Sequence, residues 1–303
     1  MPITDSMRKQ IEHFANVATC GRGSIILDLD GTALLEDRGK IFISGTVERG
    51  VESLEKLGCP LIINTLRFPL SIIRTVAPEW FSLLKHPIPA IVLNGSQIGS
   101  LVQKDGHFEF IETISFLLSS EEIASFIGGL NELVGNNIHD FIVFVYPRDW
   151  RMGELLWTPD RSQIDHLQRK HRSASRVVSW SIGGLHTFMQ ANEPVMLLLL
   201  INRASDTLLS YQHNKPSTFF THHGVHKASA SKHLAEAMSV SLSDSIGAGD
   251  TEMDTFLSEV GLAVTVGDLK VPFTGVRETI AVETPHDLGE LIISYADVVR
   301  KRL

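Results

Sequence analysis

The residues Ser24 to Thr32 read Ser-Ile-Ile-Leu-Asp-Leu-Asp-Gly-Thr, an apolar run that ends in two carboxylates, a glycine and a hydroxyl. Because side chains alternate along a strand, Asp28 and Asp30 are predicted to point to the same side. Two carboxylates at such a short separation repel each other unless a cation or a shared proton reduces the repulsion. The pair therefore indicates acid, nucleophile or metal chemistry. The alternative is a pair of loop aspartates that caps the next helix.

Three later segments place polar groups where predicted strands end or helices begin. They are residues 64–67 (Asn-Thr-Leu-Arg), Lys227, and residues 247–254 (Gly-Ala-Gly-Asp-Thr-Glu-Met-Asp). In an open parallel sheet the carboxyl ends of the strands share one crevice, so the segments are expected to converge there. Each has an ordinary alternative: Thr65 as a helix cap, Lys227 as a surface lysine, Asp250 as a turn residue.

Together these groups fit phosphoryl transfer through an aspartyl-phosphate, since a carboxylate can act as the nucleophile. Asp28 and Asp250 supply the hard oxygen ligands that Mg²⁺ prefers. Lys227 adds positive charge for the phosphoryl oxygens, and Thr65 adds a hydroxyl donor. Asp30 is placed to protonate the leaving oxygen and then to activate water.

Small residues and a further carboxylate complete this pattern. Gly31, Gly247 and Gly249 are predicted to let the backbone approach the phosphate closely. Asp254 follows Asp250 by four residues and would share its face if a helix began there, as a metal ligand or its partner.

These residues resemble the four motifs of the haloacid dehalogenase-like hydrolases, in the order of that family. The resemblance rests on residues 28–32 (Asp-Leu-Asp-Gly-Thr), Thr65, Lys227, and Gly249-Asp250 with Asp254. Asn94-Gly95 before the middle segment, and a lysine after it, are similar to the Cof-type subgroup, which has a large α/β cap between the second and third motifs.

The resemblance implies that Asp28 is the nucleophile and Asp30 the acid and base. It also implies that Mg²⁺ is held by Asp28, the Asp30 carbonyl and Asp250, with Asp254 beside them. We further expect substrate contacts from four residues: Gly31, Thr32, Arg67 and Asn94.

The chain departs from the subgroup at two positions. Leu66 stands where a glycine is usual, and Met253 stands where an asparagine is usual. Neither change removes a catalytic group, so an active enzyme is expected.

Alternating strands and helices predict a Rossmann-like α/β core with a parallel sheet. Predicted strands cover residues 24–28, 61–64, 90–93, 243–246, 262–266 and 279–282. Predicted helices cover residues 47–57, 70–77, 228–238 and 253–257, and another begins at Leu288. Asp105-Gly106 indicates a hairpin turn. We expect a discontinuous core of residues 1–96 and 215–303, and an inserted α+β cap of residues 97–214.

Within the predicted cap, Arg148 and Arg151 flank Trp150 and are candidates to bind the polar body of a substrate. A solvated loop with a partly packed tryptophan is the alternative. Three histidines at positions 222, 223 and 226 lie beside Lys227, and we interpret them as hydrogen-bonded or solvated rather than as a metal site.

Composition narrows the class of protein. The chain has 303 residues, 43% of them hydrophobic, and a net charge of −8 without a basic stripe, which argues against nucleic-acid binding. Cys20 and Cys59 lack metal or redox spacing and suit a reducing compartment. With no signal peptide or membrane span visible, a cytoplasmic monomer or homodimer without a membrane partner is expected.

The sequence therefore predicts a Mg²⁺-dependent phosphatase for a small phosphorylated metabolite. The resemblance favours a sugar phosphate. A phosphomutase and a catalytically weak protein that binds a phosphorylated metabolite for regulation remain the alternatives.

Overall fold

A sheet that includes the strand before Asp28 organises the larger part of the chain. The computed structural model describes residues 3–19, 21–37, 40–201, 219–268 and 273–303. These residues fall into two units: unit 1 comprises Met1–Arg67, Ile72–Ile114 and His226–Leu303, and unit 2 comprises Phe68–Ser71 and Ser115–Val225. Each unit is described by itself below.

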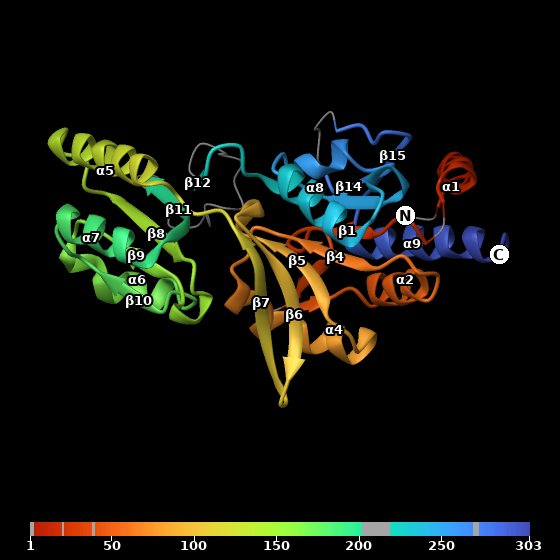
Figure 1. Cartoon of the computed structure of the whole chain (residues 1–303), viewed down its shortest axis with the longest axis horizontal. Helices are drawn as coiled ribbons and strands as arrows, with labels where there is room; N and C mark the ends of the chain where they lie inside the picture. The colour runs from red at the N-terminus through yellow and green to blue at the C-terminus, as the bar shows by residue number, and fades with distance from the viewer. Residues whose placement is uncertain (1–2, 20, 38–39, 202–218, 269–272) are drawn as a thin grey trace. The chain divides into compact units, whose positions relative to one another are not determined.

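Unit 1 contains an eight-stranded sheet (Figure 1). Its strands, in spatial order, are β15 (Glu278–Val282), β14 (Leu262–Val266), β13 (Ile246–Gly249), β1 (Ile25–Leu27), β4 (Leu61–Asn64), β5 (Ile88–Val92), β6 (Gln97–Lys104) and β7 (His107–Ser115). From β15 to β5 neighbouring strands are parallel, and β6 is antiparallel to β5. The central strands β1, β4 and β13 are buried along their whole length, as expected of a parallel sheet covered on both faces.

Helices α2 (Gly45–Glu55) and α9 (Pro285–Arg300) pack against each other, and α1 (Asp5–Val17) packs against α9 (Figure 1). Helix α8 (Lys227–Met238) packs against β5 and the 3₁₀ turn η1 (Leu93–Gly95). The remaining elements of unit 1 are β2 (Leu34–Asp37), β3 (Lys40–Ile43), α4 (Ala77–Leu84), η6 (Leu242–Asp244) and η7 (Thr255–Ser258). Helix α3 (Pro69–Thr75) begins in unit 2 and ends in unit 1.

Unit 2 is built on a five-stranded sheet of mixed direction. Its strands, in spatial order, are β10 (Arg176–Val178), β9 (Leu155–Trp157), β8 (Phe141–Pro147), β11 (Pro194–Ile201) and β12 (Phe219–Thr221). Its helices are α5 (Ser120–Gly135), α6 (Ile164–Lys170) and α7 (Ile182–Asn192), with 3₁₀ turns η2 (Trp150–Met152) and η3 (Arg161–Gln163). Trp157 is a core residue of this unit, because it is 1% exposed and its indole donates to the Trp180 carbonyl.

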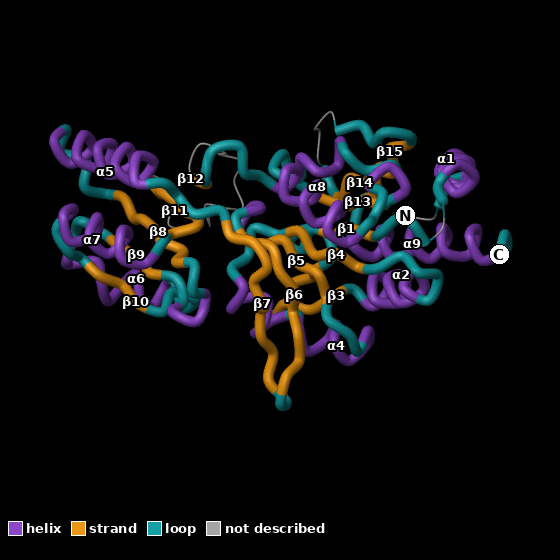
Figure 2. Tube along the Cα trace, viewed as in Figure 1, coloured by secondary structure: helices purple, strands orange, loops and turns teal. Residues whose placement is uncertain are grey.

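The alternating pattern predicted most of the unit 1 sheet, including β4 and β14 at their observed bounds. The hairpin is also confirmed: Asp105 and Gly106 both have positive φ and connect β6 to β7 (Figure 2). The strand predicted at 243–246 is wrong in position, because residues 242–244 form η6 and β13 begins at Ile246. The sequence analysis also missed α4.

The hairpin changes where the second unit begins. β6 pairs with β5 along five residues, so β6 and β7 extend the unit 1 sheet, and unit 2 resumes at Ser115 rather than at residue 97. The expected boundary between residues 214 and 215, like Cys20, lies outside the described residues. Cys59 is buried. In the described part of the chain, no helix has the length and apolar character needed to cross a membrane.

The close packing of α2 on α9 leads to a stability prediction. A Cβ added at Gly289 would lie 2.3 Å from the backbone carbon of Thr46, so Gly289→Ala must push the helices apart. We expect a loss of about 1–3 kcal/mol in unfolding free energy, measured by denaturant titration, despite the better helix propensity of alanine. The control is Gly128→Ala in α5, where nothing lies within 4 Å; it should be neutral or stabilise by up to about 1 kcal/mol. Equal effects of the two changes would contradict this explanation.

Candidate active site

Three strand ends meet at one edge of the unit 1 sheet. Asp28 follows β1, Thr65 follows β4 and Asp250 follows β13. β1 lies between the other two strands, with Leu27 in register with Ile63 on one side and with Ala248 on the other. Because the chain turns away in opposite directions from β1, this edge is the topological switch point where ligands bind in open α/β sheets.

The Lys227 amine joins two of the predicted carboxylates. Lys227 is the first residue of α8 and is 2% exposed. Its Nζ donates to Asp28 Oδ1 at 2.7 Å and to Asp254 Oδ1 at 2.6 Å. Burial favours the neutral amine, yet Asp254 and Asp28 outweigh it and hold the pKa of Lys227 above its usual value. Lys227 is therefore a buried cation and not a solvated lysine.

Asp254 is held by the loop that follows β13. Its second oxygen, Oδ2, accepts from the backbone N–H groups of Asp250 and Thr251, each at 2.9 Å. The helix predicted from residue 253 is wrong, since η7 begins at Thr255 and only as a 3₁₀ turn. Backbone donors in a tight loop, and not a shared helix face, bring Asp254 to Asp250.

Asp28, Asp250 and Asp254 offer one oxygen each within 4.8 Å of one another. Burial, followed by repulsion from Asp254, raises the pKa of Asp250 to about 6. Burial also raises the pKa of Asp28 well above its usual value, although Lys227 acts in the opposite direction. Three carboxylates facing one ammonium leave an excess of negative charge, and this donor set of hard oxygens fits a divalent cation such as Mg²⁺.

Glycines make room for the carboxylates. Gly31 has φ +74°, and a Cβ there would lie 2.0 Å from Asp250 Oδ2. A Cβ at Gly249 would lie 2.5 Å from the Asp254 carboxylate. Gly247 is predicted to let the backbone approach a phosphate, but it lies inside β13. A Cβ added there would lie 2.9 Å from the side chain of Val260. Close packing is therefore the reason for glycine at position 247. Thr32 donates to Asp250 Oδ1 at 3.1 Å.

Asp30 has a different partner from Asp28. β1 ends at Leu27, so the two aspartates lie in the turn after the strand and strand alternation does not apply. The Asp30 carboxylate accepts two hydrogen bonds from the Arg67 guanidinium, which also donates to Thr75. The Asp30 side chain is 47% exposed, whereas that of Arg67 is 11% exposed. Arg67, predicted to contact substrate, is thus also placed to orient Asp30.

Thr65 and Asn94 lie at neighbouring strand ends. Thr65 is 1% exposed; its hydroxyl accepts from the Arg67 backbone N–H, and its carbonyl accepts from the Asn94 N–H. Leu93 and Asn94 have φ of 51° and 56°. Left-handed backbone at a leucine is strained, and such strain often marks a functional turn. The roles predicted for Thr65 and Asn94 remain predictions.

The predicted cap residues lie in unit 2. Arg148 pairs with Glu193 at 3.4 Å, and the Arg151 guanidinium lies 4.6 Å from the centre of the Trp150 ring. Both arginine side chains are about half exposed, and their assignment to substrate stays a prediction.

The three histidines have hydrogen-bond partners. His222 contacts Glu122 at 3.0 Å, the His223 N–H donates to the same carboxylate, and the His226 ring caps α8. The interpretation that these histidines do not form a metal site stays a prediction.

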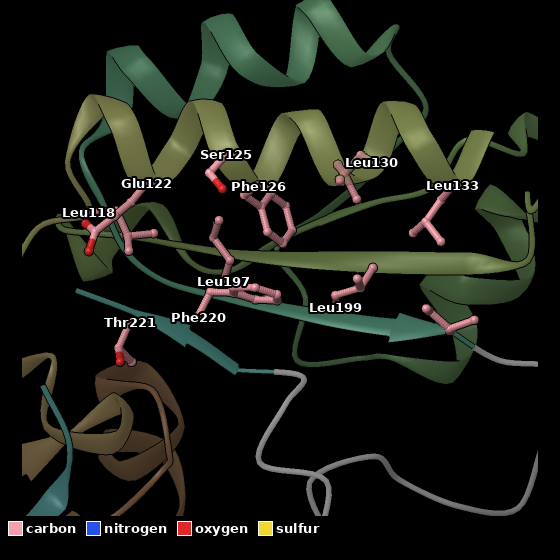
Figure 3. Close-up of a pocket in the computed structure, with 12 residues that line it drawn as sticks. Leu118, Glu122, Ser125, Phe126, Leu130, Leu133, Leu197, Leu199, Phe220 and Thr221 are labelled. Carbon is pink, nitrogen blue, oxygen red and sulfur yellow. The ribbon is translucent and has the colours of Figure 1, made fainter. Parts of the chain in front are cut away.

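A cavity of about 430 Å³ opens in unit 2 between α5 and strands β11 and β12 (Figure 3). Figure 3 shows Phe126, Leu197 and Phe220 pointing toward one another from these three elements. The lining is largely apolar and includes none of the predicted site residues.

The sequence analysis did not assign a role to Asn64, which the structure places against the first turn of α8. The signal for it was a polar residue that ends the apolar run Leu-Ile-Ile immediately before Thr65.

Comparison with known proteins identifies the family of this chain and solved structures with a similar fold. The family model of the haloacid dehalogenase-like hydrolases matches residues 25–271, and no curated protein matches the chain. Among solved structures, a phosphatase of the haloalkanoate superfamily from Bacteroides thetaiotaomicron has a TM-score of 0.63 at 15% identity, covering 91% of this chain and 95% of its own. A subclass IIB sugar phosphatase scores 0.62 at 15% identity, with 93% and 100% covered. A HAD/COF-like hydrolase from Plasmodium vivax scores 0.66 at 14% identity, with 97% and 100% covered. These likenesses concern the fold.

The raised pKa of Asp250 predicts how stability depends on pH in the metal-free protein. Since the folded form binds the proton more tightly than the unfolded form, unfolding free energy should fall as pH rises from about 4 to about 6, by about 1–3 kcal/mol. Denaturant titrations in EDTA measure this slope. Asp250→Asn should make the slope shallower, with the remainder due to the raised pKa of Asp28, and Mg²⁺ should restore stability above pH 6 only when Asp250 is present. A variant with the wild-type slope would show that Asp250 is not its source.

Proposed function

Because the chain belongs to the haloacid dehalogenase-like hydrolases, we propose that it is a Mg²⁺-dependent phosphatase that hydrolyses a small phosphorylated metabolite. One observation carries the proposal: a buried ammonium, that of Lys227, is shared by Asp28 and Asp254 at the carboxyl edge of a parallel sheet. A buried carboxylate with a cation on one oxygen has its other oxygen available to attack phosphorus.

The reaction has two steps with Asp28 as nucleophile. In the first, an Asp28 oxygen bonds to phosphorus, the bond from phosphorus to the substrate oxygen breaks, and Asp30 gives a proton to the leaving alcohol. In the second, Asp30 takes a proton from water as the water oxygen attacks phosphorus, which releases phosphate and frees Asp28. Both Asp30 oxygens are bonded to Arg67, so proton transfer requires that one of them leave the guanidinium.

Positive charge must balance the phosphoryl group. Lys227 supplies it from one side, and the Thr65 hydroxyl supplies a hydrogen bond. We propose that Asp28, Asp250 and the Asp30 carbonyl hold Mg²⁺, with Asp254 as a further ligand or a support. When bound, the metal neutralises the carboxylates and the phosphoryl oxygens, so that nucleophile and substrate can approach.

A sugar phosphate is the substrate we favour. A structural neighbour is named as a subclass IIB sugar phosphatase, which supports the class without identifying the molecule. We propose that Gly31, Thr32, Arg67 and Asn94 contact the substrate from unit 1 and that Arg148 and Arg151 contact its polar body from unit 2.

Removing the nucleophile tests the proposal. With p-nitrophenyl phosphate and Mg²⁺, Asp28→Asn should lower phosphate release on the order of 10⁴-fold, and Asp30→Asn about 10²- to 10⁴-fold. Asp5→Asn, the same change at an exposed position in α1, is the matched control and should keep wild-type activity. If wild type and Asp28→Asn released phosphate equally slowly, the enzyme assignment would fail and a binding role would remain.

The substrate class needs a separate experiment. A panel of phosphorylated sugars, nucleotides and cofactors with Mg²⁺ should give the highest kcat/KM for a sugar monophosphate. Release of inorganic phosphate without an added sugar bisphosphate supports a phosphatase. Transfer of the phosphoryl group within the sugar, dependent on that bisphosphate, would instead identify a phosphomutase.

A further inference from the structure

The Lys227 amine needs an external support to hold its position. A lysine reaches its charge through four flexible carbons, and its ammonium is a point charge without a fixed direction. Here Nζ must lie within 2.7 Å of carboxylate oxygens on two different loops. Because Lys227 is the first residue of α8, a small shift of that helix end would move the amine away from Asp28 or Asp254.

Asn64, the last residue of β4, contacts this helix end directly. Its Nδ2 donates to the Lys227 carbonyl at 3.2 Å and to Ser231 Oγ at 2.9 Å. The Ser231 hydroxyl in turn donates to the same Lys227 carbonyl at 2.9 Å. Asn64 and Ser231 are buried, so water does not compete for these bonds.

The orientation of the Asn64 amide follows from its partners. A backbone carbonyl only accepts, so the amide group that faces Lys227 must be the NH₂. The remaining oxygen, Oδ1, is buried without a hydrogen-bond partner among the described residues. An unpaired buried oxygen costs free energy, which a purely structural role could avoid by using an apolar residue.

The same helix end is fitted closely on a second side. A Cβ at Gly95 in η1 would lie 2.7 Å from the His226 carbonyl oxygen, so the turn contacts the residue before Lys227. That turn is tied to the end of β4 through the Thr65 carbonyl, which accepts from the Asn94 N–H. The end of β4 therefore fixes the start of α8 by two routes.

From these contacts we infer that Asn64 is a positioning residue for the reaction: its amide holds the Lys227 backbone so that the ammonium stays between Asp28 and Asp254. The inference rests on the proposed function for its catalytic consequence, but the geometry of Lys227 can be tested without turnover. It also explains why β4 ends in a polar residue immediately before Thr65.

The test compares Asn64→Ala with Ser231→Ala. Both remove a hydrogen bond from the same buried network, but Ser231→Ala keeps the bond from Asn64 to the Lys227 carbonyl. With p-nitrophenyl phosphate and Mg²⁺, Asn64→Ala should lower kcat about 10- to 100-fold and change KM less than about threefold, as expected when a catalytic group is misplaced. Ser231→Ala should keep kcat within about threefold of wild type, although it is also destabilised.

Crystal structures of the two variants give a readout independent of activity. In Asn64→Ala, Lys227 Nζ should lose its hydrogen bond to Asp28 or to Asp254, while in Ser231→Ala both should persist. Unchanged bonds in Asn64→Ala, or an equal fall in kcat for both variants, would overturn the inference. If wild type proved inactive, the proposed function would fail, and the position of Nζ in Asn64→Ala would still decide the role of Asn64.

Discussion

The charge balance around the Lys227 amine is the constraint on which the site depends. A single buried ammonium faces three carboxylates, those of Asp28, Asp250 and Asp254. Breaking such a cluster leaves an uncompensated charge in a low dielectric, which is strongly unfavourable. The surrounding backbone must therefore hold Asp28 and Asp254 at hydrogen-bond distance from Lys227 Nζ with Asp250 close beside them, and the strands and glycines of unit 1 serve that requirement. The same excess of negative charge makes this group of carboxylates a suitable site for a divalent cation.

The sheet and the loops around this cluster position its side chains in different ways. The parallel strands bring Asp28, Thr65 and Asp250 to one edge, because β1 is in register with β4 on one side and with β13 on the other. The loops then set direction: backbone N–H groups aim Asp254, and Gly31 lets Asp250 approach closely. The Asp30 carboxylate contacts Arg67 instead, so Asp28 and Asp30 have different partners although only Leu29 lies between them.

Much of this was predictable from sequence, since apolar runs that end in polar groups mark strand ends, and β4 and β14 were predicted at their observed bounds. Features that depend on tertiary contacts were not. The turn at Asp254 resembles the start of a helix in spacing, but its hydrogen bonds come from the preceding loop. Gly247 is small because Val260 packs against it. The partner of Asn64 lies 163 residues away, beyond the reach of any local pattern.

The strand order has a consequence for synthesis of the chain. β1 borders β4 on one side and β13 on the other, and β13 is made more than 200 residues after β1. While the chain grows, β1 can pair only with the strands that follow it closely, so its other side remains an open, apolar sheet edge. Such edges invite pairing with other chains. The last third of the protein therefore closes a vulnerable edge in the same event that brings Lys227 and Asp250 to Asp28.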